Sequence, residues 1–254
     1  MIKFTSTQWK NLFEQNGLES FNALWDLQAG WFEAPNHRRG GWSGVSRIEL
    51  QQADGSKIGI FLKRQQNHTR RTFAHPIKGE NTFTAEVRNI KHLITHDVPT
   101  LELICYGQQT DAGNQNALLA TVELVNYQPL STLIQPAHLA TLTIPQHRAI
   151  AQAVGEMTRK MHLSQRVHNC LYPKHIFIHL EGESVEARVI DVEKAKYRHS
   201  AQRRTLRDLD SLNRHATNVS KTDRLRCLLA YLDQQRMDTN SKQLWHKLAK
   251  RMKK

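Results

Sequence analysis

The sequence predicts an α+β fold of two lobes, in which an antiparallel sheet with one helix is followed by a mainly helical half. In the first half, residues 45–50 alternate apolar and polar with a period of two among other short strand-like segments, whereas after Tyr127 apolar residues recur mainly every three to four residues. The composition, 39% hydrophobic and 23% charged over 254 residues, is that of a globular chain with room for a core. We expect an N-lobe at residues 1–126 and a C-lobe at residues 127–254.

The N-lobe is predicted to begin with strand and loop and to contain one helix. Four segments have strand character, two joined by a turn at 53–56 and two by a turn at 111–114: residues 45–50, 57–63, 101–106 and 117–125. Between these pairs, apolar residues from Phe83 to Ile94 fall on one helical face. We therefore expect a helix over residues 81–94.

The C-lobe is predicted to be helical, with one hairpin and a basic C-terminal helix. Apolar stripes at helical spacing mark three helices: residues 150–161, 206–212 and 225–232. Two short strands flank the turn at 181–183 and predict a hairpin: residues 175–180 and 187–192. The tail from Ser241 has another apolar stripe: Trp245, Leu248 and Met252.

The charge of the chain restricts its partners. Thirty-six Lys and Arg oppose 23 Asp and Glu, so the net charge is +13, which calls for nucleic acid, an anionic membrane surface or a phosphorylated ligand. Without a helix-turn-helix pattern, zinc spacing or an aromatic ladder, no specific nucleic acid is expected. No apolar run reaches the roughly 18 residues that span a bilayer, and no signal peptide is recognisable. Three cysteines without a CxxC pair indicate a reducing compartment.

Three features of the N-lobe suggest a phosphate ligand, although each alone has a plainer explanation. Before the first strand of the hairpin, small residues can let backbone N–H groups approach a phosphate: Gly40, Gly41, Ser43 and Gly44. Such a segment is more often only a turn. Lys63 ends an apolar strand, where a lysine usually extends to solvent. Glu86 lies on the next helix, where it can pair with Lys63.

A loop and a hairpin in the C-lobe make the set more specific. His168 opens a loop that leads into the hairpin, and Asp191 directly follows the second strand. Together with the glycine-rich turn, the strand lysine and the helix glutamate, they occur in the order of a protein-kinase core. The order predicts a protein-kinase-like bilobal fold.

Several stretches also carry a family resemblance: residues 33–45, 61–64, 168–178 and 191–195. They resemble the lipopolysaccharide kinase superfamily, which phosphorylates Kdo or heptose sugars, and most closely its InaA branch. The resemblance covers about residues 30 to 215 and implies a shortened helical C-lobe. It further implies ATP- and Mg²⁺-dependent phosphoryl transfer to a sugar hydroxyl of the lipopolysaccharide inner core. We expect a cytoplasmic protein of a Gram-negative bacterium, peripheral to the inner membrane.

The resemblance also implies roles for individual residues. The small residues of the glycine-rich turn would cover the nucleotide phosphates: Gly40, Gly41, Ser43 and Gly44. Lys63 would contact the α- and β-phosphates, and Glu86 would orient it. Backbone groups of Glu123 and Val125 would meet adenine. The remaining metal-binding and catalytic roles would fall in the C-lobe: Asp191 and His175 on Mg²⁺, and His168 and Cys170 in the catalytic loop.

The catalytic loop departs from the kinase pattern. Where His-Arg-Asp is expected, the chain has His168-Asn169-Cys170, so a thiol stands where the substrate hydroxyl usually finds its base. Loss of a general base costs on the order of 10²–10⁴-fold in rate. Three acids are candidate replacements: Glu193, Asp208 and Asp210. The alternative to a kinase is a nucleotide- or lipid-binding pseudokinase that regulates envelope or stress physiology.

The basic residues gather in segments that suit an anionic glycolipid acceptor such as the lipopolysaccharide core. One segment follows Asp191 and contains four arginines: Arg198, Arg203, Arg204 and Arg207. Another lies at residues 64–78. The tail from Ser241 carries six Lys and Arg and no acid beside its apolar stripe. This pattern is typical of a helix on an anionic membrane, or of a helix that packs its stripe on the lobe and leaves its lysines in water.

Overall fold

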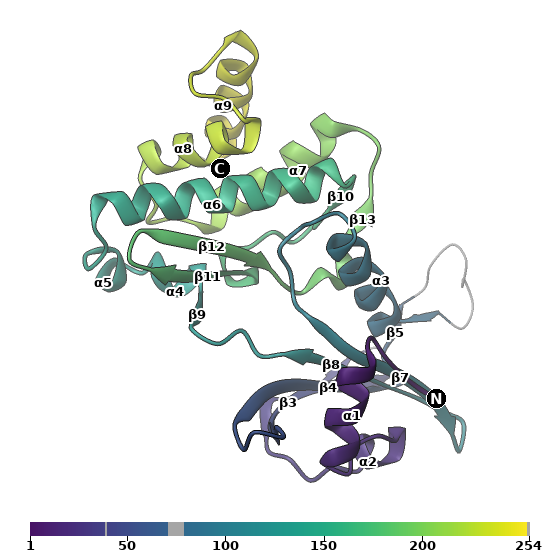
Figure 1. The fold of residues 1–254 in the computed structure, drawn as a ribbon. Helices are drawn as coiled ribbons and strands as arrows, with labels where there is room; N and C mark the ends of the chain where they lie inside the picture. Colours follow the sequence, from purple (N-terminus) through teal and green to yellow (C-terminus); the bar gives the residue numbers. More distant parts are fainter. Residues whose placement is uncertain (39, 71–78, 253–254) are drawn as a thin grey trace. The chain divides into compact units, whose positions relative to one another are not determined.

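The computed structural model describes residues 1–38, 40–70 and 79–252, and it confirms the mixed α+β fold (Figure 1). The chain forms two compact units. Unit 1 comprises Met1–Ile90 and Leu101–Val125, and unit 2 comprises Lys91–Thr100 and Asn126–Lys254.

Unit 1 is built on an antiparallel sheet. In the described part of the chain this sheet has six strands, in the order β1-β7-β8-β4-β3-β2. Their bounds are β1 Ile2–Phe4, β2 Trp31–Arg38, β3 Gly41–Gln51, β4 Lys57–Gln66, β7 Leu103–Asp111 and β8 Asn114–Val122. Two short strands, β5 (Thr69–Arg70) and β6 (Glu80–Asn81), pair separately. The predicted hairpins, β3–β4 and β7–β8, are both present.

One face of this sheet holds the core of unit 1. Ile60 and Leu62 of β4 are fully buried there, because alternate residues of a strand point to the same face. Two helices cover this face: α1 (Thr7–Gln15) and α2 (Phe21–Trp25) (Figure 1). Neither helix was predicted. Each begins at a serine whose hydroxyl accepts a backbone N–H three residues on, Ser6 for α1 and Ser20 for α2.

Helix α3 (Thr82–Ile94) confirms the predicted helix of this half. Its first turn is fixed by the Asn81 side chain, whose Oδ1 accepts from the N–H of Phe83 at 2.9 Å. Phe83 and Ile90 are buried, as the apolar spacing predicts.

Unit 2 is mainly helical. Its described helices are α4 Leu130–Leu133, α5 Pro136–Leu139, α6 Ile144–Leu163, α7 Ala201–His215, α8 Lys221–Leu232 and α9 Thr239–Met252. Two 3₁₀ turns and five short strands complete the described part of this unit: η1 Pro173–His175, η2 Val192–Lys194, β9 Tyr127–Pro129, β10 Arg166–Val167, β11 Ile176–Glu181, β12 Ser184–Val189 and β13 Lys196–Tyr197. Helix α6 lies between the β11–β12 hairpin and α8 (Figure 1). The hairpin and the long helices correspond to the predicted ones.

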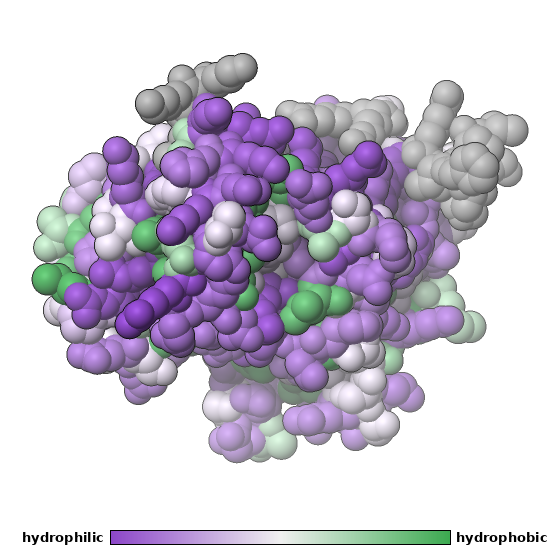
Figure 2. Space-filling view, turned by 90° about the horizontal axis from the view of Figure 1, so that it is seen from above, coloured by the Kyte–Doolittle hydropathy of each residue, from purple (hydrophilic) through white to green (hydrophobic). Residues whose placement is uncertain are grey.

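The C-terminal helix α9 places its apolar stripe inside unit 2. Leu248 is 2% exposed and packs with Leu209, Leu228 and Tyr231, while Trp245 is partly buried beside them. The lysines of α9 remain at the surface, which Figure 2 shows as largely hydrophilic on this side of the molecule. Of the two readings of the tail, the structure therefore shows the helix that packs on its own lobe. No helix in the described residues is long and apolar enough to cross a bilayer.

Candidate functional site

The predicted lysine and glutamate of unit 1 form an ion pair. Nζ of Lys63 lies 2.6 Å from Oε1 of Glu86, and the Glu86 side chain is 3% exposed. Lys63 points away from the core face because it alternates with Leu62, and this direction brings it to α3. A charge-assisted bond this short at a largely buried carboxylate fixes the position of the ammonium. Its role toward phosphate stays a prediction.

The glycines of the predicted phosphate turn are explained by packing around the β2–β3 hairpin. Gly40 has φ of +77°, and a Cβ at Gly41 would stand 2.0 Å from the carbonyl oxygen of Gln66. Ser43 and Gly44 continue along β3. Arg39 lies outside the described residues. The turn therefore needs its glycines with or without a ligand, and phosphate binding stays a prediction.

Glu123 and Val125, the residues predicted to meet adenine, follow β8. The Glu123 carboxylate accepts two hydrogen bonds from Arg47, both at 2.8 Å. Its N–H donates to the carbonyl of Gly59 at 2.9 Å, and its own carbonyl accepts from the N–H of Val125 at 3.1 Å. The Arg47–Glu123 pair fixes the end of this strand, while Val125 is 61% exposed.

The loop at His168 and Asn169, predicted to be the catalytic loop, is held by a buried carboxylate of unit 2. Asp208 on α7 is fully buried, and it accepts hydrogen bonds from the backbone N–H groups of His168 at 2.7 Å and Asn169 at 2.9 Å. Asp208 was a candidate for the missing base. Its complete burial and these bonds make that assignment wrong, because no substrate hydroxyl can reach it. It is instead a positioning residue that the sequence reasoning did not recognise.

A buried polar network extends from Asp208. Nε2 of His162 on α6 lies 3.0 Å from Oδ2 of Asp208, and Nδ1 lies 2.9 Å from the hydroxyl of Tyr231. That hydroxyl is 2.6 Å from Oγ1 of Thr205. Because a carboxylate only accepts hydrogen bonds, Nε2 of His162 donates to it. The loop is thereby tied to three helices: α6, α7 and α8.

The predicted metal ligands of unit 2 lie together. Nε2 of His175, at the end of η1, is 3.1 Å from Oδ2 of Asp191. Nδ1 of the same ring is 2.9 Å from the carbonyl oxygen of Cys170. Burial lowers the pKa of His175, although the Asp191 carboxylate acts in the opposite direction. An imidazole in its neutral form and a carboxylate are ligand types that divalent cations accept, so binding of a metal here stays a prediction.

His168 joins the loop to the segment before Asp191. Its ring is fully buried, and Nε2 donates to the carbonyl of Ile190 at 2.9 Å. The ring also stacks on His175, with centroids 5.6 Å apart. A buried ring of this kind positions its neighbours rather than exchanging protons with a substrate. The role assigned to His168 by resemblance stays a prediction.

Cys170 is partly exposed, and its backbone carbonyl accepts a hydrogen bond from the His175 ring.

Two other acids were candidate replacements for the base. Asp210 faces Arg214 at 3.4 Å and Arg251 at 3.6 Å. Glu193 was expected on the same side as Asp191 if the strand continued. That expectation is wrong, because β12 ends at Val189, Asp191 has φ of +55°, and Glu193 lies in η2.

The arginines after Asp191 differ in burial. Arg204 is 8% exposed, and its guanidinium donates to the carbonyls of Arg198 and His199 at 2.5 and 2.8 Å. Arg204 therefore stabilises the start of α7, and its guanidinium is not presented to solvent for a ligand. Arg203 and Arg207 are exposed on the same helix. Of the basic segment at 64–78, residues 71–78 lie outside the described residues.

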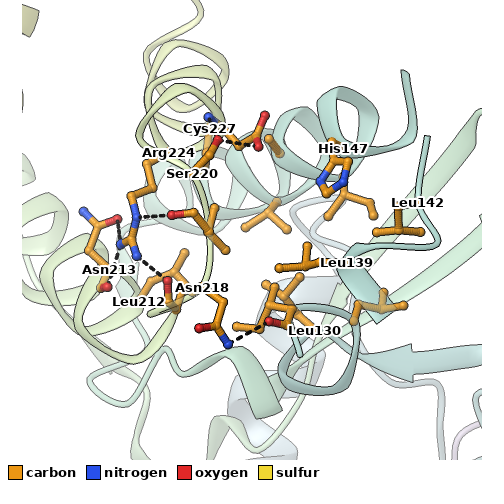
Figure 3. A pocket seen from close by; sticks show the side chains of 18 residues that line it. Leu130, Leu139, Leu142, His147, Leu212, Asn213, Asn218, Ser220, Arg224 and Cys227 are labelled. Atoms are coloured by element: carbon orange, nitrogen blue, oxygen red, sulfur yellow. Dashed lines mark hydrogen bonds between the residues drawn. The ribbon is translucent and has the colours of Figure 1, made fainter. Parts of the chain in front are cut away.

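Unit 2 also contains an apolar cavity of about 150 Å³ between α4, α5, α6, α7 and α8 (Figure 3). This cavity was not predicted from the sequence. Leucine, isoleucine, valine and alanine side chains form most of its wall: Leu130, Leu133, Ile134, Leu139, Leu142, Ile150, Ala151, Val154, Leu212, Ala216 and Val219. Arg224 lies at its edge and donates to the backbone carbonyls of Asn213 and Val219. None of the predicted site residues lines this cavity. The spacing of apolar residues in α6 predicted that one face of the helix lies in the core. Spacing alone does not distinguish a filled core from a cavity.

Comparison with known proteins identifies the family. Residues 22–231 match the lipopolysaccharide kinase (Kdo/WaaP) family. The chain is 28% identical over 205 residues to Protein InaA of Escherichia coli (strain K12), covering 81% of this chain and 92% of that protein. Its fold is similar to that of a structure described as WaaP in complex with acyl carrier protein, with a TM-score of 0.68 and 21% identity over 100% of both chains. The resemblance inferred from the motifs is confirmed, and the chain belongs to the lipopolysaccharide kinase (Kdo/WaaP) family.

Proposed function

We propose that the protein transfers the γ-phosphoryl group of ATP, with Mg²⁺, to a sugar hydroxyl of the lipopolysaccharide inner core. The observation that carries the proposal is that both side-chain pairs used by this chemistry lie together in a member of this family. Lys63 is fixed by Glu86 in unit 1, and His175 faces Asp191 in unit 2. Phosphoryl transfer depends mainly on positioning and on charge stabilisation, which these pairs are suited to supply.

Each pair has a distinct task in this proposal. Lys63 places a positive charge against the α- and β-phosphates, with its ammonium held by Glu86. Asp191 and His175 supply a carboxylate oxygen and a ring nitrogen, a donor set that fits a divalent cation. When bound, Mg²⁺ neutralises charge on the phosphates. Asp208 keeps the loop in place through the N–H groups of two of its residues.

The residue at the usual base position limits the proposed rate. Cys170 holds a thiol where an aspartate would accept the substrate proton. Asp208 is buried and Glu193 lies on a 3₁₀ turn, so neither replaces the aspartate by position. We therefore expect a slow kinase that relies on positioning and charge stabilisation, with a rate on the order of 10²–10⁴-fold below that of a chain with a base.

The proposed acceptor is an anionic glycolipid, and the exposed basic side chains support this choice. Arg203 and Arg207 on α7 can bind phosphate or carboxylate groups bidentately. On α9, exposed lysines such as Lys247 and Lys250 can contact an anionic membrane, each contributing about 1 kcal/mol. Because the apolar stripe of α9 is packed inside unit 2, this peripheral contact with the cytoplasmic face of the inner membrane is electrostatic.

Two measurements on one set of proteins test the proposal. Calorimetry gives Mg²⁺-dependent ATP binding, and labelled ATP gives phosphate transfer to purified core lipopolysaccharide. We would compare the wild type with Lys63→Met, Asp191→Ala and Cys170→Asp. Transfer by the wild type that is lost in Asp191→Ala supports the kinase. ATP binding without transfer in the wild type, with transfer gained by Cys170→Asp, contradicts it and favours a pseudokinase.

A second candidate function is a lipid-binding module, and the cavity of Figure 3 favours it. A structure similar to this one contains WaaP with acyl carrier protein, a protein whose name indicates acyl cargo. We propose that the apolar cavity accepts an alkyl chain. Ala151→Phe, which fills the cavity wall, should abolish binding of a fluorescent long-chain fatty acid. Gln152→Phe, on the exposed side of α6, is the matched control. Equal binding by both variants contradicts the idea.

A further inference from the structure

A polar pocket of about 480 Å³ lies in unit 1, between the start of α3 and the hairpin of β7 and β8. Its volume falls within the range of about 300–1,000 Å³ that is typical of small-molecule sites. Hydroxyls and carboxamides dominate its described lining, which includes Asn81, Thr84, Gln108, Thr110 and Gln115. None of the described residues that line it was assigned above to the nucleotide or to the metal.

The hairpin turns polar side chains toward α3. The hydroxyl of Tyr106 on β7 lies 2.7 Å from Oγ1 of Thr84 on α3, and it donates to Oε1 of Gln108 at 3.0 Å. Because alternate residues of a strand share a face, Gln108 and Thr110 lie on the same side of β7 as Tyr106. Gln115 on β8 is the register partner of Thr110. These side chains therefore line the pocket from the side of the hairpin that faces the helix.

Asn81 brings an unused hydrogen-bond donor to this pocket. Its Oδ1 accepts from the backbone N–H of Phe83 at 2.9 Å and from Nε2 of Gln65 at 2.5 Å. Since a backbone N–H only donates, the orientation of the carboxamide is fixed and Nδ2 is left over. Asn81 is 8% exposed, and within the described residues its Nδ2 donates to no protein atom. A donor buried in this way is costly unless a ligand or water accepts from it.

The lining is unsuited to charged and to apolar ligands. Its carboxylate, Glu80, is paired with Arg88, and the Glu80 side chain is 9% exposed. Among the described residues of the lining there is no basic side chain to bind phosphate, and no aliphatic or aromatic one to bind an alkyl chain, in contrast to the cavity of Figure 3. Carboxamides and hydroxyls both donate and accept hydrogen bonds, as the hydroxyls of a sugar do. A neutral polyhydroxylated ligand matches this chemistry.

We propose that this pocket binds a neutral mono- or disaccharide through the carboxamides of Asn81, Gln108 and Gln115. Nδ2 of Asn81 donates to one sugar hydroxyl, and the carboxamide of Gln115 offers a donor and an acceptor to neighbouring hydroxyls. Because the described lining has no aromatic ring on which a sugar could stack, we expect a dissociation constant on the order of 1 mM. The pocket includes neither Lys63 nor Glu86, and sugar binding there does not require phosphate transfer.

Nuclear magnetic resonance of ¹⁵N-labelled protein tests this directly. Titration with methyl β-D-glucopyranoside and with maltose should shift the side-chain amide signals of Asn81, Gln108 and Gln115. The shifts give the dissociation constant, which we expect on the order of 1 mM. Inorganic phosphate and sodium octanoate are the anionic and apolar probes, and they should leave the same signals unchanged.

Variants separate the pocket from other places where a sugar could bind. Asn81→Asp keeps an oxygen for Phe83 and Gln65 but removes the donor, so sugar binding should weaken about fivefold, the equivalent of one hydrogen bond. Gln115→Leu, at a half-buried position of β8, should weaken it similarly and keeps the test valid if Asn81→Asp misfolds. Gln51→Leu makes the same replacement at an exposed position of β3, and this matched control should bind sugar as the wild type does.

Three results would overturn the proposed sugar site: no shift of these amide signals at about ten times the expected dissociation constant, sugar binding that is unchanged in both Asn81→Asp and Gln115→Leu, or equal shifts with phosphate or octanoate. Failure of the proposed kinase function is distinguishable from these. Sugar-dependent shifts at these amides without any phosphate transfer support the pocket and contradict the kinase. Transfer to core lipopolysaccharide, with amide signals that no sugar shifts, supports the kinase and overturns the pocket.

Discussion

The Lys63–Glu86 pair of unit 1 and the His175–Asp191 pair of unit 2 each join a basic side chain to a carboxylate, but they are built differently. In unit 1 the carboxylate is the hidden partner, with 3% of the Glu86 side chain exposed, and the ammonium donates to it at 2.6 Å. In unit 2 the carboxylate is the open partner, with 38% of the Asp191 side chain exposed, and the His175 ring facing it is held by the carbonyl of Cys170.

This difference separates the complete pair, whose carboxylate is hidden from solvent, from the open pair, whose carboxylate stays exposed. Lys63 and Glu86 satisfy each other and contribute to the folded state, so a ligand must add to them. Because Asp191 is exposed to solvent, we expect the His175–Asp191 pair to contribute little to the stability of the fold. The predictions below test this contrast, beginning with the largest expected effect.

The largest loss of stability should come from replacing Asp208, which holds the loop at His168 and Asn169. In Asp208→Ala two buried N–H groups lose their acceptor, and His162 loses its carboxylate. We expect the free energy of unfolding to fall by about 4 kcal/mol. Urea titration measures it. Asp210→Ala, two residues along α7 and partly exposed, should cost less than about 1 kcal/mol. Similar losses in both variants would show that the loop does not depend on Asp208.

Breaking the two pairs themselves should give unequal results. Lys63→Ala removes the cation opposite a buried carboxylate, so we expect a loss of about 3 kcal/mol in the free energy of unfolding. Asp191→Ala removes an open carboxylate and should change stability by less than about 0.5 kcal/mol. Both should abolish phosphate transfer. Equal destabilisation by the two variants would remove the distinction between the complete pair and the open pair.

Restoring an acid at the loop should raise activity without altering either pair. If Cys170 stands at the base position, Cys170→Asp should increase the transfer rate by about 10²-fold. Rates with labelled ATP and core lipopolysaccharide measure this, and unchanged nucleotide affinity shows that both pairs are intact. An unchanged rate would indicate that the position does not serve the acceptor hydroxyl.

Alkylation of the wild-type cysteines tests whether the side chain of Cys170 is accessible, which the Cys170→Asp experiment assumes. Burial raises the pKa of the fully buried Cys105 to about 12, so its thiol should stay unreactive at a pH of about 8. The pKa of Cys227, which is partly exposed, is also raised to about 12, so it should react slowly. Cys170 is partly exposed and should be modified first. Mass spectrometry after iodoacetamide treatment identifies the labelled residue. Labelling of Cys105 before Cys170 would contradict the burial in the structure.

The smallest effects concern the inner and outer faces of α9. Leu248→Ala opens a space in the core of unit 2 and should cost about 2 kcal/mol. Lys247→Glu, on the outer face, should change stability by less than about 0.5 kcal/mol and weaken binding to anionic vesicles. Thermal unfolding and vesicle sedimentation measure the two properties. Vesicle binding that depends on Leu248 rather than Lys247 would mean that the helix leaves the core to reach the membrane.

Elements with a strong local pattern could be predicted from the sequence. The β3–β4 hairpin and α3 follow from alternation and helical spacing, which depend on neighbouring residues. The positions of Lys63 on a strand and Glu86 on the next helix predicted their pair, whereas the resemblance over the chain supplied the His175–Asp191 pair. The helices α1 and α2 were missed, although Ser6 and Ser20 were visible caps, because short helices carry little periodic signal.

Other features of the site required coordinates. Glu193 was placed by strand alternation, and a left-handed residue at Asp191 ended that alternation. Asp208 looked like any other helical acid until its burial and its two backbone donors were known. The apolar cavity could not be separated from a filled core by spacing alone.

The sequence by itself determined the family, the positive charge and the residue types that meet in each pair, because these depend on which side chains are present and in what order. Only the tertiary structure decided which charges are buried and which remain open. Burial depends on contacts between residues far apart in the chain, such as Asp208 with His168 or Leu248 with Leu209. The same carboxylate chemistry therefore supports a loop at Asp208 and remains open to solvent at Asp191, because water reaches only the second.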